Sequence, residues 1–176
     1  MNPVIVFAGS SSKESINKQL ANYAASTLEN TEYDILDLND FPLPLFSIDI
    51  ENQKGFPEKA VEFDDLIENS SGLIISLAEH NGSYSAVFKN LMDWLSRITP
   101  KMFRNKPMLL MSTSPGGRGG AGVLAAAMDR FPRHDAKIIE TFSLPSFSEN
   151  FQVNQIRNLD FDKKLIEITR KFEASL

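Results

Sequence analysis

The 176-residue sequence contains no cysteine and only two histidines, His80 and His134. The absence of cysteine excludes disulfides, thiolate metal sites and cysteine nucleophiles. Two histidines leave little from which to build a zinc site or a Ser-His-Asp triad, so we expect no metal site. Any redox chemistry of this chain must therefore be carried by a bound organic cofactor.

Long apolar runs and basic runs are also missing. No apolar stretch approaches the roughly 20 residues that a membrane-spanning helix needs, and the first residues lack the pattern of a signal peptide. The hydrophobic content of 42% is ordinary for a globular protein, and the net charge of -5 argues against general nucleic-acid binding. We expect a cytoplasmic protein with no nucleic-acid or membrane partner, folded as one domain over residues 1–176.

The opening stretch, residues 3–20, organises the rest of the chain. A short apolar run ends at Gly9, where we expect the chain to turn sharply, and a serine-rich loop leads into a helical pattern. The start of a helix offers unpaired N–H groups, which suit an anion and above all a phosphate. Hydroxyl and amide side chains lie in this loop at Ser10, Ser12, Ser15 and Asn17.

Two well-known phosphate loops do not fit this stretch. The Walker signature needs Gly-Lys-Ser/Thr and the dinucleotide fingerprint needs three spaced glycines, whereas Gly9 is the only glycine before Gly55. The loop therefore favours a phosphate that is held rather than cleaved, as in a mononucleotide such as FMN. The alternative is a serine-rich helix cap with no ligand.

The remaining chain alternates strand and helix patterns. Further strands are predicted at 33–38, 72–77, 107–113 and 137–144, each followed by a helical pattern. Five strand-helix units imply an α/β fold with a parallel sheet and helices on both faces. Strands one, three and four are apolar throughout, as in the centre of such a sheet, which favours the strand order 2-1-3-4-5.

Residues 39–56 are predicted to be a long apolar loop that two prolines, Pro42 and Pro44, keep from being helical. Such a loop can line a pocket mouth, form a dimer interface or pack on the protein's own body.

Three loops have unusual compositions, at 9–17, 78–85 and 114–122. In the order 2-1-3-4-5 they follow strands one, three and four, the strands at and beside the topological switch. Ligands of open α/β sheets bind at the carboxyl ends of such strands. The coincidence predicts a ligand site built from these three loops.

The three loops resemble those of the NADPH-dependent FMN reductase family of flavodoxin-like proteins. The family's first pattern is G-S-x-R-x-x-S-x-N-x-x-L, and residues 9–20 read G-S-S-S-K-E-S-I-N-K-Q-L. Its second is P-E-Y-N-x-S followed by L-K-N-x-x-D-W, beside A-E-H-N-G-S and F-K-N-L-M-D-W here. The third, S-P-G-G-x-G-G, is intact at 114–120. The resemblance implies a flavodoxin-like three-layer sandwich.

The resemblance also implies positions for bound FMN. The phosphate would lie against Ser10, Ser15 and Asn17, and the isoalloxazine ring against Glu79, Asn81, Gly82 and Ser83 on one side and Ser114, Pro115, Gly116 and Gly117 on the other. Three residues depart from the family pattern: Ser12 replaces its arginine, Ala78 its proline and His80 its tyrosine. We expect Lys13 to lie over the phosphate as a substitute charge and His80 to lie beside the ring.

The function that this resemblance implies is an FMN-dependent NAD(P)H oxidoreductase. It would take hydride from NADPH or NADH and pass electrons to a quinone, a flavin or another small acceptor. A flavodoxin-type electron carrier and a flavin-free binding or regulatory protein are the alternatives. The apolar 41–48 segment and the family habit of sharing flavin sites between subunits imply a homodimer or a dimer of dimers.

Overall fold

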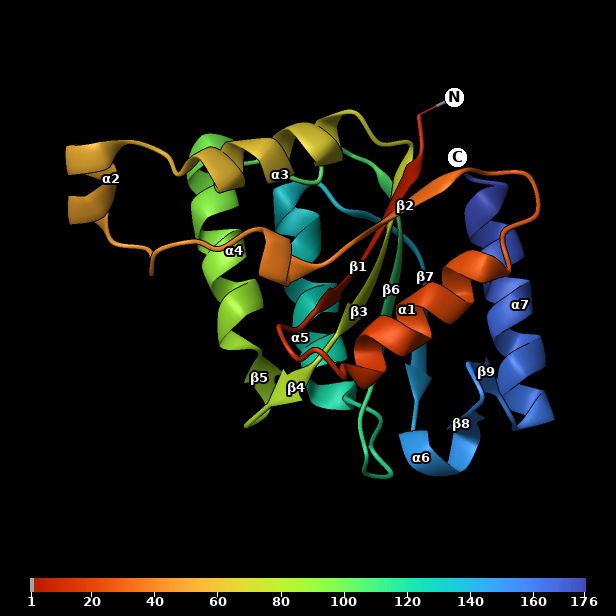
Figure 1. Cartoon of the computed structure of the whole chain (residues 1–176). Coiled ribbons are helices and arrows are strands. Elements are labelled where there is room, and N and C mark those ends of the chain that lie inside the picture. Colours follow the sequence, from red (N-terminus) through yellow and green to blue (C-terminus); the bar gives the residue numbers. More distant parts are fainter. Residues whose placement is uncertain (1) are drawn as a thin grey trace.

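A five-stranded parallel sheet forms the centre of the computed structural model, which describes residues 2–176 (Figure 1). From one edge to the other the strands are β2 (Tyr33–Leu36), β1 (Val4–Gly9), β3 (Gly72–Leu77), β6 (Pro107–Thr113) and β7 (Lys137–Leu144). Counted within this sheet, the order is 2-1-3-4-5, so the predicted topology is confirmed. The apolar strands β1, β3 and β6 are the central three and are almost wholly buried.

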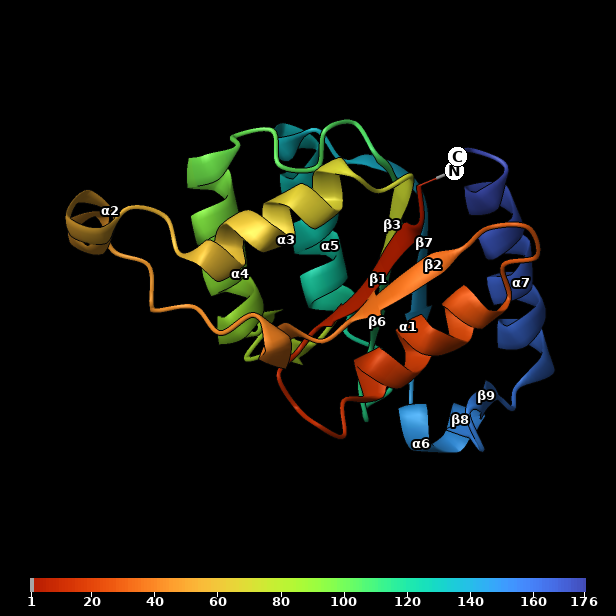
Figure 2. The same ribbon diagram turned by 45° about the horizontal axis from the view of Figure 1, so that its top comes forward.

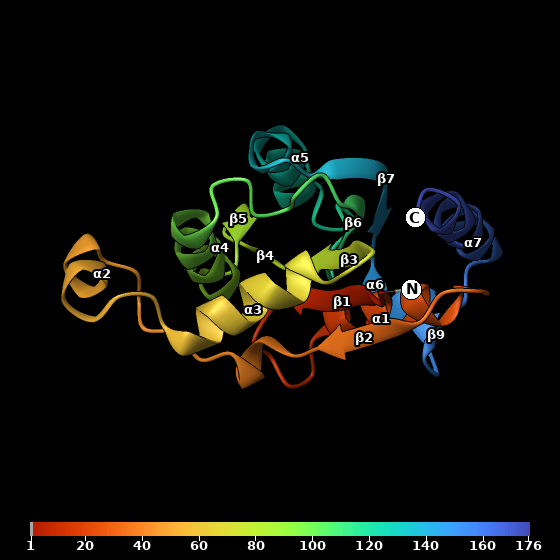
Figure 3. The ribbon, with the colours of Figure 1, turned by 90° about the horizontal axis from the view of Figure 1, so that it is seen from above.

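Helices cover both faces of the sheet, as Figure 3 shows from above. α1 (Ile16–Ser26) and α7 (Leu159–Glu173) lie on one face, and α3 (Glu58–Glu68), α4 (Ala86–Ile98) and α5 (Ala121–Arg130) lie on the other. Successive side chains of a strand point to opposite faces, so Val4 and Val6 join the α1/α7 core while Ile5 and Phe7 join the other. The predicted three-layer α/β sandwich is confirmed.

The segment 39–56 corrects one prediction. It contains α2 (Ile48–Lys54), where we expected no helix. Pro42 and Pro44 precede this helix and do not interrupt it; the Ser47 hydroxyl accepts from the Asp49 N–H at 3.2 Å, and Gly55 ends it at φ 73°. No residue of α2 is buried, and Figures 1 and 2 show it projecting beyond α4. We call residues 44–56 the arm.

Smaller elements complete the chain. The second predicted strand ends at Leu36, because residues Leu38–Asp40 form a 3₁₀ turn instead. After β3 a short hairpin joins β4 (Glu79–His80) to β5 (Ser83–Tyr84). Another 3₁₀ turn, Phe131–His134, leads toward β7. After β7 come α6 (Phe147–Asn150), β8 (Phe151–Gln152) and β9 (Gln155–Ile156), near the start of α1 (Figure 1).

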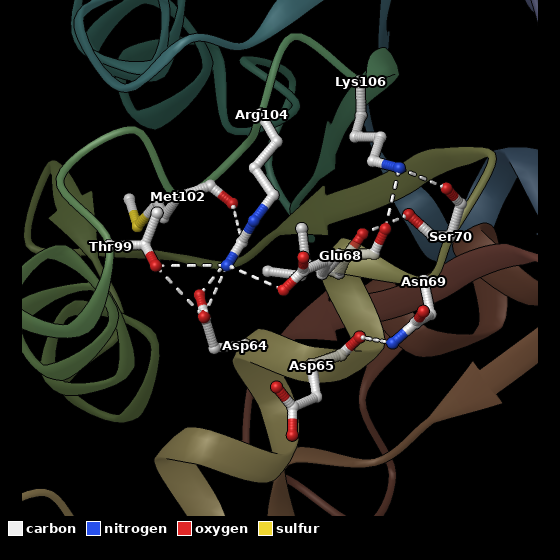
Figure 4. A network of polar contacts seen from close by, with 10 residues as sticks. Asp64, Asp65, Glu68, Asn69, Ser70, Thr99, Met102, Arg104 and Lys106 are labelled. Carbon is white, nitrogen blue, oxygen red and sulfur yellow. Dashed lines mark hydrogen bonds and ion pairs between the residues drawn. The ribbon is translucent and has the colours of Figure 1, made fainter.

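An ion-pair network fastens α3 to the loop between α4 and β6, beside the amino ends of β3 and β6 (Figure 4). The Arg104 guanidinium donates to both carboxylate oxygens of buried Asp64, at 3.0 and 2.5 Å, and to the Thr99 hydroxyl at 3.1 Å. Lys106 donates to the carbonyl oxygens of Glu68 and Ser70. The network thus ties α3 and the residues after it to the segment that enters β6.

Within residues 2–176, no helix combines the length and the apolar character that a membrane crossing requires.

Candidate functional site

The exits of β1, β3 and β6 surround a cavity of about 240 Å³ at the carboxyl edge of the sheet. Its lining comes from all three predicted loops and consists of Ser10, Ser12, Glu14, Ser15, Ile16, Asn17, Ala78, Glu79, His80, Thr113, Ser114 and Pro115. The structure therefore brings together most of the residues proposed from the sequence. The others lie on the same loops but outside the cavity wall: Lys13, Asn81, Gly82, Ser83, Gly116 and Gly117.

The first loop presents free donors to this cavity. Ser15 is the N-cap of α1, and its hydroxyl oxygen accepts from the Lys18 N–H at 3.2 Å. The N–H groups of Ile16 and Asn17, in the first turn of α1, have no hydrogen-bond partner among residues 2–176. No acidic side chain lies in that turn to neutralise the helix dipole. The start of α1 is therefore open to an anion.

Gly9 owes its place to packing, not to a turn. A Cβ at this position would lie 3.1 Å from Leu77 Cδ2 and 3.2 Å from Phe88 Cγ, so a larger residue would push β1 away from α4. Its φ is not in the left-handed region, and it is the last residue of β1. The sharp turn that we expected at Gly9 was therefore wrong.

Asn17 has a role that the sequence did not indicate. Its side chain is 3% exposed and bridges three elements: Oδ1 accepts from the Ser76 hydroxyl at 2.7 Å and from the Thr113 N–H at 3.0 Å. Its Nδ2 donates to the Thr113 carbonyl at 3.2 Å. The amide thus fastens α1 to the ends of β3 and β6, while its second Nδ2 hydrogen and the backbone N–H of Asn17 have no partner among residues 2–176.

The second loop is a tight hairpin. Asn81 and Gly82 form its tip with φ of 53° and 74°, the left-handed pair that a two-residue type I′ turn requires. The Asn-Gly pair in the sequence was a signal for this turn that we did not use. His80 is exposed on β4 and lines the cavity.

Glu79 connects the second loop to the third. Its Oε2 accepts from the Val123 N–H in the first turn of α5 at 3.0 Å, so the carboxylate lies at the positive end of that helix. A Cβ on Gly122 would lie 3.1 Å from both carboxylate oxygens, so glycine is what allows this approach. The contact fixes the spacing between the two loops.

The glycines of the third loop fall into two groups. Gly119 and Gly120 have φ of 58° and 74°, and a Cβ on either would collide with neighbouring atoms, so the fold itself requires them. A Cβ on Gly116 or Gly117 would meet no atom of the described chain within 4 Å, and neither has a left-handed φ. Nothing in the chain's own packing explains glycine at 116 and 117.

The K-N-x-x-D-W motif lies on α4, away from the cavity wall. Asn90 Nδ2 and Trp94 Nε1 both donate to the Pro44 carbonyl, at 3.0 and 2.8 Å, and Asn90 Oδ1 accepts from the Phe46 N–H at 2.8 Å. Lys89 and Asp93 pair with each other on the helix surface. The motif holds the start of the arm.

Comparison with known proteins supports this description. The sequence profile described as NADPH-dependent FMN reductase matches residues 3–149. A quinone reductase of Escherichia coli (strain K12) is 31% identical over 122 residues, and a 2-hydroxy-1,4-benzoquinone reductase of a Burkholderia species is 37% identical over 120. Each match covers 67% of this chain but 63% of the relative, less than two thirds of its length.

Solved structures agree with the sequence relatives. The flavoenzyme FerB of Paracoccus denitrificans, an NAD(P)H:(acceptor) oxidoreductase, superposes with a TM-score of 0.79 at 25% identity, covering 99% of this chain and 96% of that one. Flavodoxin 1 of Bacillus cereus, at 15% identity and a TM-score of 0.59, shares the fold. With a profile match that spans most of its length, this chain belongs to the NADPH-dependent FMN reductase family.

Proposed function

We propose that this protein is an FMN-dependent oxidoreductase that takes hydride from NADPH or NADH and delivers electrons to a quinone or another small acceptor. The observation that carries the proposal is the meeting of three strand exits at one cavity that opens beside free helix N–H groups. The sequence relatives, quinone reductases among them, support the acceptor class.

The residues present fit a flavin mononucleotide. Unpaired N–H groups of Ile16 and Asn17, together with the hydroxyls of Ser10 and Ser12, form a donor set suited to a phosphate dianion. The open space over Gly116 and Gly117 suits a flat ring that approaches the backbone closely. The cavity is smaller than the roughly 300–1,000 Å³ of sites that enclose drug-sized ligands, so part of the ligand would lie outside it, against the loops.

When bound, FMN supplies the redox chemistry, since it accepts hydride from a reduced nicotinamide and releases electrons to an acceptor. The chain's own residues bind and orient. The start of α1 and the serines hold the phosphate, and the Glu79 contact with Val123 sets the distance between the two loops that face the ring. No side chain is required as an acid or base in this scheme.

The test is an absorption spectrum of the purified protein, followed by anaerobic addition of NADPH and, separately, of NADH. We expect a flavin band that one of the two donors bleaches rapidly and that a quinone restores. A band that dithionite bleaches but neither donor bleaches would instead favour an electron carrier, and no band even after FMN is added would favour a flavin-free protein.

We also propose that the protein is a homodimer or a dimer of dimers. The arm exposes apolar side chains that a small monomer rarely leaves in water: Leu45 is 79% exposed, Ile48 48% and Phe56 43%. The arm projects from the body, where a second copy can reach it (Figure 2). Light scattering at micromolar concentration tests this, and a monomeric mass would reject it. A cytoplasmic location likewise remains a proposal, tested by fractionation of cells that express the chain.

A further inference from the structure

A second cavity, of about 230 Å³, adjoins the first loop. Ser11 lines it, whereas the neighbouring Ser10 and Ser12 line the candidate flavin site. The rest of its wall comes from the segment after β2 and from α4, namely Leu38, Asn39, Phe41, Pro42, Leu43, Val87, Asn90 and Leu91. The loop at residues 10–12 therefore contributes to the walls of both cavities.

The wall of the second cavity is mainly apolar. Its polar side chains are those of Ser11, Asn39 and Asn90. The Asn90 amide holds Pro44 and Phe46 of the arm and keeps one N–H of Nδ2 without a partner among residues 2–176. Asn39 Nδ2 donates to Asp37 Oδ1 at 2.8 Å, whereas Asn39 Oδ1 has no partner among residues 2–176. An apolar slot with a free amide acceptor and free donor groups at its wall suits a flat ring that carries both hydrogen-bond donors and acceptors.

Asp37 holds the Asn39 side-chain amide in place. One of its carboxylate oxygens accepts both the backbone N–H and the side-chain amide of Asn39, and the other accepts from Lys18 Nζ. The Lys18 ammonium lowers the pKa of Asp37, so the carboxylate stays ionised and its charge is balanced by the same lysine. The Asn39 amide is thus held in one orientation, with Oδ1 as its unused atom.

We infer that the second cavity binds the adenine ring of the nicotinamide donor, an inference that rests on the proposed function. An exocyclic amino group is a donor, and asparagine is the side chain that commonly recognises adenine in nucleic acids. At about 230 Å³ the cavity accepts one ring system and not a whole dinucleotide. Because one loop lines both cavities, a dinucleotide whose adenine occupies the second cavity can extend along this loop toward a flavin bound at the first.

The experiment is calorimetric titration of the FMN-loaded full chain with AMP, with oxidised NAD and with nicotinamide mononucleotide, none of which reduces the flavin. Val87→Phe fills the cavity from α4, and Asn39→Ala removes the free acceptor. Val61→Phe is the matched control, since Val61 lies on the outer surface of α3 and is 38% exposed. Asn39 is exposed, so its truncation leaves the fold intact even if Val87→Phe does not.

We expect Val87→Phe to weaken the binding of AMP and of NAD at least tenfold. Asn39→Ala should weaken the binding of both ligands about fivefold, because the loss of one neutral hydrogen bond costs about 1 kcal/mol. Nicotinamide mononucleotide and FMN should bind all variants within twofold of the wild type, and Val61→Phe should change nothing.

Several results would overturn the inference. They are no AMP binding by the wild type, no loss of AMP affinity in Asn39→Ala, and equal losses for AMP and nicotinamide mononucleotide. If Val87→Phe lowers the molar mass in light scattering while AMP binding persists, the cavity holds a second copy of the chain and the inference is wrong. Because AMP can be titrated without flavin, a chain that shows the predicted AMP losses but binds no FMN would refute the proposed function alone.

Discussion

Replacing Asn17 by alanine tests the most specific feature of the site. In the wild type the Asn17 amide makes three hydrogen bonds inside the protein, to Ser76 and to both backbone groups of Thr113. Ser76 is fully buried and Thr113 is 1% exposed, so both lose a partner inside the protein. The substitution therefore leaves buried polar groups unsatisfied at the junction of α1, β3 and β6.

The magnitude follows from these contacts. An orphaned buried donor or acceptor costs about 1–3 kcal/mol, and the Thr113 N–H is fixed in the β6 backbone and cannot turn to another acceptor. Because the Ser76 hydroxyl can rotate, we count the two Thr113 backbone groups and expect a loss of about 2–6 kcal/mol in the free energy of unfolding. In a chain of this size each kcal/mol lowers the melting temperature by about 2–4 °C. A central loss of about 4 kcal/mol thus corresponds to about 8–16 °C.

The assay is urea unfolding followed by circular dichroism, with Asn22→Ala as the matched control. Asn22 is on the same helix, but its Oδ1 is buried without a hydrogen-bond partner among residues 2–176, so its truncation removes no such bond. We expect Asn17→Ala to lose at least 2 kcal/mol more than Asn22→Ala. Equal losses in the two variants would refute the role given to the Asn17 amide.

Three further predictions concern other parts of the chain. Arg104→Ala leaves the Asp64 carboxylate buried and unpaired, so we expect a loss of about 3 kcal/mol in urea unfolding with FMN affinity unchanged; a loss below about 1 kcal/mol would contradict this. Burial and the hydrogen bond to Asp162 raise the pKa of Tyr23 from 10.0 to about 12, so stability is full below pH 10 and falls as the pH rises toward 12. Tyr23→Phe should weaken that alkaline fall between pH 9 and 12, and an unchanged pH profile would reject the assignment. Lys13→Ala should weaken the binding of FMN several-fold but change the affinity for riboflavin, which has no phosphate, by less than twofold. Equal losses of affinity for both flavins would show that Lys13 does not contact the phosphate.

The sheet and its order were predictable because uninterrupted apolar runs mark strands that are covered on both faces. The predicted bounds of β3, β6 and β7 agree with the structure. α2 was missed because it buries no residue and so carries no amphipathic pattern. Its signals were local ones, Ser47 as the cap and Gly55 as the end, in a stretch where nearby prolines suggested a loop.

The candidate site was predictable in position but not in detail. The compositions of the three loops, together with the strand order, indicated where they would meet. The sequence could not indicate that Asn17 points into the sheet, because its partner Thr113 lies 96 residues away. The same holds for Glu79, which caps α5 from a distance of 44 residues. An asparagine or a glutamate in a ligand loop has the same sequence pattern whether it faces the ligand or holds the loop.

The most direct test of the flavin site is a fluorescence titration of Gly117→Leu with FMN. A Cβ at this position would meet no atom of the described chain within 4 Å and requires no left-handed φ, so we expect the unfolding temperature to stay at or slightly above that of the wild type. The leucine would instead occupy the space that we assign to the flavin ring. We predict that FMN binding falls at least tenfold in a fully folded variant. A folded Gly117→Leu protein that binds FMN as tightly as the wild type would contradict the account.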